Sequence, residues 1–430
     1  MTEPDASQTA DPPLRVLILN QPFAPDVVAT AQIAKDLADA LVSRGHDVTA
    51  LASRSIYGSV GATLPKRETI DGITVRRVGA NLFGKSSTLG RIADFALYYV
   101  HAISFGLFHR RFDVVIALTT PPYIALVGAL MKKLRRTRLI YWLMDVYPDV
   151  MVSHGMVRER RLAHRALCRL HRYVLNKSDA TIALGRCMKD RLIAQGADAD
   201  SIHIVRPWSP APAFSPSAND DNSYRKEWNA ADRLLIAYCG NFGLAHDVQT
   251  FLDAAKELRD DDRFLFAFVG GGKRKAAVEM FVKDNDLTNC AIAPYQPLEK
   301  LPELLAAADV HLVTMAPSMS GLVVPSKFFG VAGAGRATIF VGPANSEIAR
   351  CIEDWSAGVV IEPGDSASLV RTLNTFADDE KELVQMGARA RAGFAQFAER
   401  TICTQSIIEL VEAADAPKAN VVPATSSEAA

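Results

Sequence analysis

The segment Ala316–Pro343 restricts the possible folds of this chain more than any other. It contains a glycine turn, Gly321–Lys327, then a short apolar helix that ends at Gly333 and Gly335, and finally the run Thr338–Val341. Such a run, apolar on both faces, is typical of a strand inside a parallel sheet. Because a strand is also predicted directly before the turn, the segment indicates an α/β fold built from repeated strand–helix units.

The start of this predicted helix has the features of an anion site. Gly321 allows a ligand to approach the backbone closely, and either Ser326 caps the helix or Pro325 opens it. Amide groups in a first helical turn have no partners within the helix, and Lys327 adds a positive charge beside them. This combination favours a nucleotide diphosphate as ligand, although glycines also end helices in α/β domains that bind nothing.

The length of the chain indicates two domains, because 430 residues exceed one ordinary hydrophobic core. Its 49% hydrophobic and 22% charged residues are typical of a soluble globular protein. Residues 1–205 contain 27 Lys and Arg against 18 Asp and Glu, whereas the rest of the chain contains 21 against 30. This asymmetry predicts different partners for the two halves, with an anionic surface as a candidate for the first half.

Cysteine spacing and hydropathy indicate a cytoplasmic protein. The six cysteines are scattered, without a C-x-x-C pair and without histidines at metal-ligand spacing. We therefore expect reduced thiols and no metal site. The polar start, Met1–Pro13, is unlike a signal peptide, and no apolar run reaches the ~20 residues of a membrane-spanning helix. Attachment to the inner face of the plasma membrane stays open as an alternative.

Apolar runs alternate with amphipathic segments along most of the chain, which predicts two Rossmann-like domains with parallel sheets. The clearest unit is the helix Ala29–Ser43 between the strands Arg15–Asn20 and Asp47–Leu51. The predicted divisions are a disordered N-terminus (1–13), a first domain (14–205), a linker (206–230), a second domain (231–397), a final helix (398–415) and a disordered tail (416–430).

Two basic segments in the first half each allow two interpretations. Lys132–Arg138 has five cations in seven residues at a predicted helix C-terminus. These cations either interact with the helix dipole or contact an anionic membrane at ~1 kcal/mol per charge. The arginines of the predicted helix Arg158–Asn176 either form a solvated face or bind phosphate or lipid headgroups.

Three glycine-containing loops follow predicted strands in the second half: Gly240–Gly243, Gly270–Lys275 and Gly321–Lys327. Because the carboxyl ends of parallel strands meet at one sheet edge, these loops are expected to converge on a single anionic ligand. The chain has no G-x-G-x-x-G after a strand, no P-loop and no nucleophilic serine elbow. Classical dinucleotide and P-loop sites are therefore not supported.

Asp145 is the candidate catalytic residue of the first half. It directly follows the predicted buried strand Leu139–Met144, where a base or a ligand of an acceptor hydroxyl would lie. Asp149, in the same loop, fits a helix cap better. The small residues at Ala29 and Thr30 either let another molecule approach or serve tight helix–sheet packing.

Six motifs suggest a family. In chain order they are N-Q-P-F-A-P-D (Asn20–Asp26), M-D-V-Y-P-D (Met144–Asp149), N-K-S-D-A-T-I-A-L (Asn176–Leu184), Y-C-G-N-F-G (Tyr238–Gly243), F-V-G-G-G (Phe268–Gly272) and G-L-V-V-P-S-K-F-F-G (Gly321–Gly330). With these motifs the chain resembles family 4 glycosyltransferases of the GT-B fold, and most of all WbuB-type bacterial polysaccharide enzymes. The resemblance covers about Arg15–Phe397.

The resemblance implies two Rossmann-like domains facing a cleft, with the final helix returning to the first domain. It implies retaining transfer of a sugar from a nucleotide-diphosphate sugar to a lipid-linked or saccharide acceptor in cell-surface polysaccharide synthesis. No cofactor, essential metal or nucleic-acid partner is expected, because amides and basic side chains neutralise the leaving diphosphate.

The positions of the loops and the resemblance together predict the site residues. On the acceptor side they are Ala29, Thr30 and Tyr147, with Asp145 as catalytic residue. On the donor side they are Gly240, Asn241, Gly243, His246, Gly271, Lys273, Arg274, Ser320, Gly321, Leu322, Val323 and Lys327.

The chain departs from the family pattern at four of its positions. The family has two glutamates eight positions apart around the third loop, where this chain has Met319 and Lys327. The Arg and Lys of the family's first loop fall on Asn241 and His246. Other side chains of this chain must therefore make the contacts to the diphosphate and the ribose, with Lys327, Lys273 and Arg274 as the candidates for the diphosphate. Two other interpretations stay open: a non-catalytic GT-B-like nucleotide-binding scaffold, and an epimerase or dehydrogenase on a similar frame.

Overall fold

The computed structural model describes residues 12–56, 63–79, 88–209, 221–243 and 246–413 of the chain. The predicted tail (416–430), nearly all of the predicted disordered N-terminus and the middle of the predicted linker lie outside these residues. Contacts divide the chain into two compact units. The first unit comprises Met1–Trp142, Tyr173–Thr181 and Ile407–Ala430, and the second comprises Leu143–Arg172 and Ile182–Ser406.

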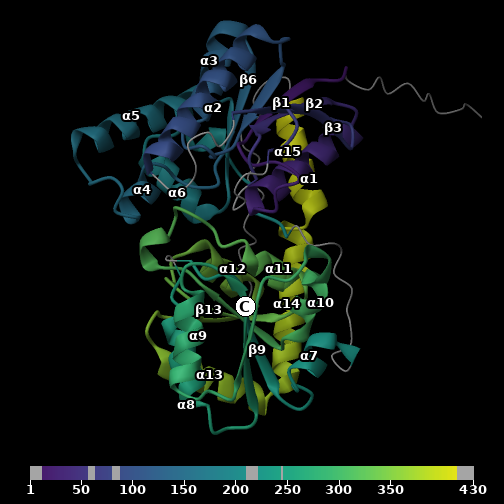
Figure 1. The fold of residues 1–430 in the computed structure, drawn as a ribbon, viewed down its shortest axis with the longest axis vertical. Helices are drawn as coiled ribbons and strands as arrows, with labels where there is room; N and C mark the ends of the chain where they lie inside the picture. Colours follow the sequence, from purple (N-terminus) through teal and green to yellow (C-terminus); the bar gives the residue numbers. More distant parts are fainter. Residues whose placement is uncertain (1–11, 57–62, 80–87, 210–220, 244–245, 414–430) are drawn as a thin grey trace, which may run out of the picture. The chain divides into compact units, whose positions relative to one another are not determined.

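The N-terminal half of the chain forms an eight-stranded sheet with the strand order β3-β4-β2-β1-β5-β6-β7-β8 (Figure 1). The described pairs are parallel, except that β3 is antiparallel to β4 at the edge. The strands are β1 (Arg15–Leu19), β2 (Asp47–Ser53), β3 (Arg67–Ile70), β4 (Ile73–Val78), β5 (Val114–Ala117), β6 (Arg138–Trp142), β7 (Ala180–Ala183) and β8 (Ile202–Ile204). The helices are α1 (Ala29–Ser43), α2 (Thr88–Phe108), α3 (Ala125–Arg135), α4 (Asp149–Ser153), α5 (Leu162–Lys177) and α6 (Arg186–Ala194).

The second unit contains a six-stranded sheet of order β11-β10-β9-β12-β13-β14, in which every neighbouring pair is parallel. The strands are β9 (Leu234–Asn241), β10 (Phe264–Gly271), β11 (Cys290–Ala293), β12 (Val310–Thr314), β13 (Ala337–Val341) and β14 (Gly358–Ile361). The later helices of the chain are α7 (Ser223–Glu227), α8 (Gln249–Glu257), α9 (Lys275–Asp284), α10 (Leu301–Ala307), α11 (Lys327–Gly333), α12 (Glu347–Trp355), α13 (Ser366–Asp378), α14 (Glu380–Phe397) and α15 (Arg400–Glu412).

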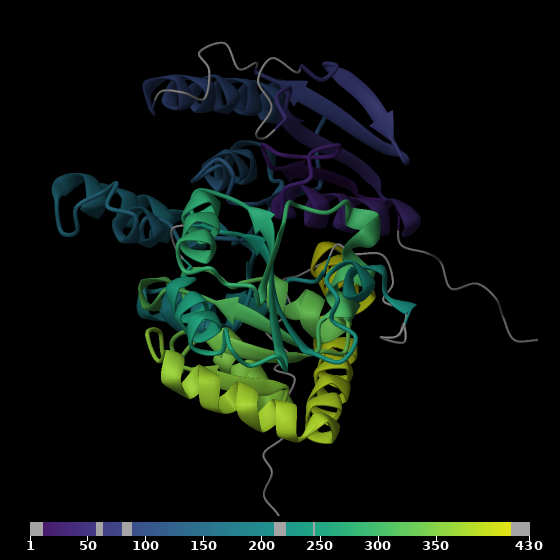
Figure 2. The ribbon, with the colours of Figure 1, turned by 60° about the horizontal axis from the view of Figure 1, so that its bottom comes forward.

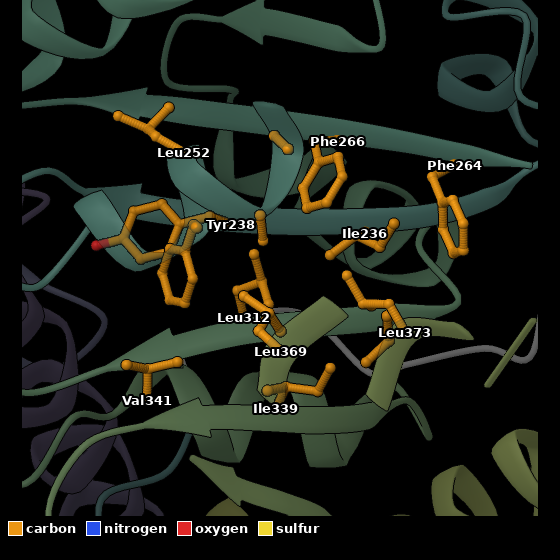
Figure 3. Packing of buried hydrophobic residues seen from close by; sticks show 14 of the residues in the cluster. Ile236, Tyr238, Leu252, Phe264, Phe266, Leu312, Ile339, Val341, Leu369 and Leu373 are labelled. Carbon is orange, nitrogen blue, oxygen red and sulfur yellow. The ribbon is translucent and has the colours of Figure 1, made fainter. Parts of the chain in front are cut away.

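Apolar side chains cover both faces of the second sheet. Ile236 and Tyr238 of β9 lie in one hydrophobic cluster, and Leu235 and Ala237 lie in another, because successive side chains alternate across a strand. Figure 3 shows the first cluster, in which the Tyr238 ring packs beside other core side chains. α14 packs against β13 and α13 packs against β14. Figures 1 and 2 show α13 in yellow-green and α14 in yellow beside this sheet. The predicted α/β class is confirmed.

Most predicted elements are present, and their boundaries differ in informative ways. The helix Ala29–Ser43 has the predicted ends. β9 and β10 extend through Asn241 and Gly271, where a turn was predicted. α5 begins at Leu162 rather than at Arg158, and the short helix α4 was not predicted.

Glycines allow β9 and β10 to continue side by side to their carboxyl ends. Gly270 pairs with Gly240 and has φ +143°, and a β-carbon at Gly270 would overlap the carbonyl oxygen of Gly240. A β-carbon at Gly272 would overlap Asn241. The two backbones are thus too close for any side chain at Gly270.

We predict that Gly270→Ala destabilises the protein far more than Gly364→Ala. Gly364 has φ +89°, and a β-carbon there would meet no atom within 4 Å, so its substitution costs only backbone strain, about 1–2 kcal/mol. At Gly270 steric overlap adds to the strain, and we expect a loss of about 3 kcal/mol or more. Urea unfolding of both variants measures the difference, and equal losses would contradict the close backbone contact.

Candidate functional site

The candidate site lies at the carboxyl ends of β9, β10 and β12. β9 ends at Asn241 and β10 at Gly271, and these two residues are paired. The chain after β12 forms the turn that leads to α11, whose first residue is Lys327. The three predicted glycine loops therefore meet within the second unit, as their positions after parallel strands predict.

Lys327 extends from α11 onto the first glycine loop. Its Nζ donates a hydrogen bond to the Tyr238 Oη at 2.5 Å and lies 3.5 Å from the carbonyl oxygen of Asn241. The ammonium also lies 4.0 Å from the centroid of the Tyr238 ring. A β-carbon at Gly240 would lie 2.9 Å from the Cε of Lys327, so glycine provides the space for this side chain.

The positive charge of Lys327 is held by an aromatic ring, a hydroxyl and a carbonyl group. Among the described residues, no Asp or Glu forms an ion pair with it. Burial lowers the pKa of Lys327 to about 7. The half-buried ammonium is therefore partly desolvated without a compensating anion among the described residues, a state that an anionic ligand would stabilise.

Tyr238 forms the base of this arrangement. Its ring is fully buried in the core cluster, and its hydroxyl points away from the other labelled side chains in Figure 3. The hydroxyl accepts from Lys327 and donates to the carbonyl oxygen of Asn241 at 2.8 Å. Both hydrogen-bonding functions of this hydroxyl are thus used, and burial raises the pKa of Tyr238.

His246 contributes a neutral imidazole to the same site. Its Nδ1 lies 3.0 Å from the carbonyl oxygen of Thr314, which can only accept, so Nδ1 carries the proton. Burial, followed by the positive charges of Lys327 and Arg274, lowers the pKa of His246 to about 4. At neutral pH its Nε2 therefore presents a lone pair.

Lys327 and His246 line a cavity of about 240 Å³. The other lining residues are Met315, Met319, Val323, Val324, Pro325 and Ser326. The cavity is thus mainly apolar, with one cation, one imidazole acceptor and the hydroxyl of Ser326, which is the composition expected of a small-molecule site.

Other predicted donor residues support the loops or are already engaged. Arg274 donates to the carbonyl oxygen of His246 at 2.9 Å and thereby braces the first loop. Ser320 donates to the Asn345 side chain at 3.2 Å. Lys273 is exposed. Gly243 and Gly271 have partly exposed backbones, and a β-carbon at either would contact a neighbouring ring or amide side chain.

The start of α11 differs from the expected anion site. The amides of Leu322 and Val323 donate to the carbonyl oxygen of Met319, at 3.0 and 3.4 Å. Ser326 is the N-cap residue, but its side chain makes no capping hydrogen bond. Gly321 has φ +71°, and a β-carbon there would lie 3.1 Å from the carbonyl oxygen of Cys187. Lys327, rather than these amides, provides the charge of the site.

The loop after β6, which contains Asp145, contacts the third glycine loop within the second unit. The amide of the following residue, Val146, donates to the carbonyl oxygen of Leu322 at 3.0 Å. Burial raises the pKa of Tyr147. Asp149 accepts hydrogen bonds from Arg191 and Gln195, each at 2.7 Å, and lies in the first turn of α4.

Two acceptor-side residues belong to the first unit. Ala29 and Thr30 form the start of α1, where the carbonyl oxygen of Thr30 accepts from the Asn20 side chain at 3.2 Å. Their roles stay predictions.

Sequence reasoning missed Tyr238 and Thr314 as members of the site. Both occupy strand positions with the pattern of ordinary core, and only the fold brings their polar atoms to Lys327 and His246. The weak signal for Tyr238 was its position two residues before a glycine at a strand end.

The described residues contain neither a candidate metal site nor a candidate membrane-spanning helix. In these ranges, no group of three or more His, Cys, Asp and Glu side chains has an arrangement that could bind a metal ion. No helix in the part of the chain that the structure describes is both long and apolar enough to span a bilayer.

Comparisons with known proteins agree with this architecture. Residues 29–208 match the glycosyl transferase 4-like domain, and residues 220–393 match the glycosyl transferases group 1 domain. A protein of Escherichia coli named as the colanic acid biosynthesis glycosyl transferase WcaI is 25% identical over 92% of this chain and 98% of its own.

Solved structures extend the similarity to the fold. HepE of Anabaena, crystallised in complex with UDP, has a TM-score of 0.68 at 16% identity and matches 93% of this chain and 99% of its own. Sucrose-phosphate synthase of Thermosynechococcus elongatus has a TM-score of 0.75 at 14% identity and matches 93% and 98% of the two chains.

Two Rossmann-like sheets with these neighbours define the chain as a GT-B fold protein. The two domain matches, which together span most of the sequence, identify the family of the chain. The chain belongs to the glycosyltransferases that combine a glycosyl transferase 4-like domain with a glycosyl transferases group 1 domain. The predicted family and enzyme class are confirmed, and the matched families are those of glycosyltransferases rather than of epimerases or dehydrogenases.

We predict that His246 remains neutral down to about pH 5, because its pKa is about 4. Lys327→Met removes the nearby positive charge, and the pKa of His246 should then rise. NMR titration of the imidazole nitrogens measures both the pKa and the Nδ1–H tautomer. A titration near the ordinary histidine value in the wild-type protein would contradict the buried geometry.

Proposed function

We propose that the protein is a retaining glycosyltransferase of bacterial cell-surface polysaccharide synthesis. It moves a sugar from a nucleotide-diphosphate sugar to a lipid-linked or saccharide acceptor. The observation that supports this proposal most is Lys327, which has no ion-pair partner among the described residues and lines a cavity together with His246 and the segment that leads into α11. The similarity to WcaI and the UDP complex of HepE agree with it.

In the proposed reaction, the bond between the anomeric carbon and the diphosphate oxygen breaks, and the acceptor oxygen forms the new bond to that carbon. Negative charge grows on the leaving diphosphate, so a fixed cation stabilises the transition state more than the ground state. Lys327 supplies this charge, with Lys273 and Arg274 as further candidate ligands. The glycines, including Gly243, let the donor approach the backbone.

The acceptor hydroxyl must lose its proton during transfer. Asp145 orients or deprotonates this hydroxyl, because it follows β6 at the carboxyl end of the sheet and precedes the residue that contacts Leu322. Ala29, Thr30 and Tyr147 are the proposed acceptor-side residues. The sugar, the base and the linkage are to be identified by turnover of a panel of donors and acceptors.

We predict that Lys327→Met weakens binding of UDP by roughly 10- to 100-fold, because one charge-assisted contact is lost. Isothermal titration with UDP measures the affinity. Lys283→Met is the matched control, since this exposed lysine of α9 lies outside the site and should leave the affinity unchanged. Equal affinity for UDP in the Lys327→Met variant would contradict the assignment.

The same contact predicts a pH dependence of donor binding. In the unliganded protein the pKa of Lys327 is about 7, and a bound diphosphate should raise it, so binding takes up a proton above pH 7. UDP affinity should therefore fall as the pH rises from 7 to 9, by at most about tenfold per pH unit. In the Lys327→Arg variant the arginine stays charged over this pH range, so the UDP affinity of the variant should not fall in the same way.

Asp145→Asn should lower kcat by roughly 100-fold or more and leave UDP affinity unchanged. The assay uses a panel of labelled sugar nucleotides with lipid-linked and saccharide acceptors. Asp149→Asn is the control in the same loop: Asp149 is bound by Arg191 and Gln195, so its loss should lower thermal stability and spare kcat. Equal losses of kcat in both variants would contradict the role of Asp145.

The panel also tests the proposal as a whole. If the wild-type protein binds UDP and transfers no sugar from any donor, the scaffold interpretation gains support. Met319 and Lys327, which replace the family's glutamates, are the reason to make this test. We further propose a cytoplasmic location with peripheral attachment to the inner face of the plasma membrane, where a lipid-linked acceptor would be found.

A further inference from the structure

The beginning of α5 and the loop before it form a strongly basic surface. Between Arg158 and Arg172 the chain has six arginines and one acidic residue, Glu159. Arg160, Arg165, Arg169 and Arg172 line a hollow of about 330 Å³, together with His164 and Cys168. This concentration of positive charge lies outside the donor site.

Most of these guanidinium groups are unpaired within the described part of the chain. Arg172 donates to the carbonyl oxygen of Gln195 at 3.0 Å, whereas Arg161, Arg165 and Arg169 form no ion pair with any residue that the structure describes. All three are exposed. Their charges are therefore available to an anionic partner.

The other basic segment, Lys132–Arg138, is different. Lys132 forms an ion pair with Asp179 at 2.7 Å, and Arg135 donates to the carbonyl oxygens of Leu107 and His109. Arg138 donates to the carbonyl oxygens at the end of α15. Three of its five cations are thus engaged in contacts within the protein, which makes this segment a weaker candidate for binding an anionic surface.

Apolar side chains accompany the free arginines. Leu162 is 83% exposed, and Met156, in the loop before α5, is 66% exposed. On α5, Leu162 lies three positions before Arg165, and Arg165 lies four before Arg169, so these side chains share one face of the helix. The buried side chains His171 and Val174 lie on the opposite side.

We propose that the surface formed by Arg160, Leu162, Arg165 and Arg169, named the α5 face, docks on an anionic lipid surface. The arginines contact lipid phosphates, and Leu162 enters the boundary between headgroups and acyl chains. An amphipathic basic helix start with an exposed leucine has the chemistry of a membrane-surface element.

Other occupants fit less well. A second copy meeting the α5 face symmetrically would place arginines against arginines, which like-charge repulsion opposes. A nucleic acid or an acidic saccharide would use the arginines but would leave Leu162 in water. Only a lipid surface uses both kinds of side chain. The inference rests on the proposed function and deepens it, because a lipid-linked acceptor is the reason for an enzyme of this class to sit on a membrane.

The test is co-sedimentation of the full chain with vesicles, in the absence of donor and acceptor. One set of vesicles is phosphatidylcholine alone, and the other contains about one third phosphatidylglycerol. The wild-type protein should bind the anionic vesicles, bind the neutral ones far more weakly, and lose binding as NaCl is raised.

Two variants separate the contributions of charge and apolar contact. Arg160→Gln/Arg165→Gln/Arg169→Gln should reduce the partition coefficient on the order of 100-fold. Leu162→Ser should reduce it about tenfold, and this loss should persist at raised NaCl. Both variants alter exposed side chains, so circular dichroism should show an unchanged fold.

Lys256→Gln/Lys283→Gln/Lys381→Gln is the matched control, because it removes the same charge from three exposed lysines of α8, α9 and α14. It should bind nearly as well as the wild-type protein. An equal loss in this control, or equal wild-type binding to both kinds of vesicle, would overturn the proposal. So would sedimentation velocity that showed a wild-type dimer and a monomeric arginine variant.

The outcome is independent of catalysis. If the proposed transfer reaction fails, UDP binding or turnover is lost while vesicle binding is unaffected. If the docking proposal fails, vesicle binding is absent while transfer to a water-soluble acceptor proceeds.

Discussion

The contact of backbone with backbone at the ends of β9 and β10 is the constraint on which the candidate site depends. No side chain fits at Gly270, so the backbones of the two strands stay close and paired through Gly271, beside the site. The small volume at Gly240 leaves room for Lys327 to reach back from α11. Without these glycines, the lysine could not lie over Tyr238, and the cavity would lose its cation.

The way in which the lysine is held explains its properties. A carboxylate beside Lys327 would stabilise the ammonium and would also neutralise it toward a ligand. A ring, a hydroxyl and a carbonyl oxygen stabilise it only in part, so burial dominates and the pKa falls to about 7. The same charge helps to keep His246 neutral. Burial therefore lowers the pKa of both titratable side chains that line the cavity, and the charge of Lys327 adds to the effect on His246.

Much of the fold could be predicted from the sequence, because apolar runs alternate with amphipathic helices at regular spacing. α1 has its predicted ends, and the three glycine loops meet as parallel strands require. The glycines at the ends of β9 and β10 indicated a turn, since glycine is usual there, and only the pairing of Gly240 with Gly270 shows that the strands continue. Ser326 satisfied the sequence rule for a cap, but its side chain does not cap α11. The contact of Lys327 with Tyr238 joins positions 89 residues apart, which no local pattern records.

The two basic segments show why charge in a sequence does not by itself identify a binding surface. In Lys132–Arg138 the cations follow an apolar helix, and the fold uses three of them on Asp179 and on carbonyl groups at the ends of α2 and α15. For the arginines of the segment Arg158–Asn176 the sequence left two interpretations open, a solvated face or the binding of phosphate or lipid headgroups, and in the structure four of them line a hollow near the 83% exposed Leu162. Solvation alone accounts for the exposed arginines but not for Leu162, because contact with water does not stabilise an apolar side chain. The combination of unpaired cations and exposed apolar side chains on one face is what distinguishes a surface that binds lipid from one that only faces solvent.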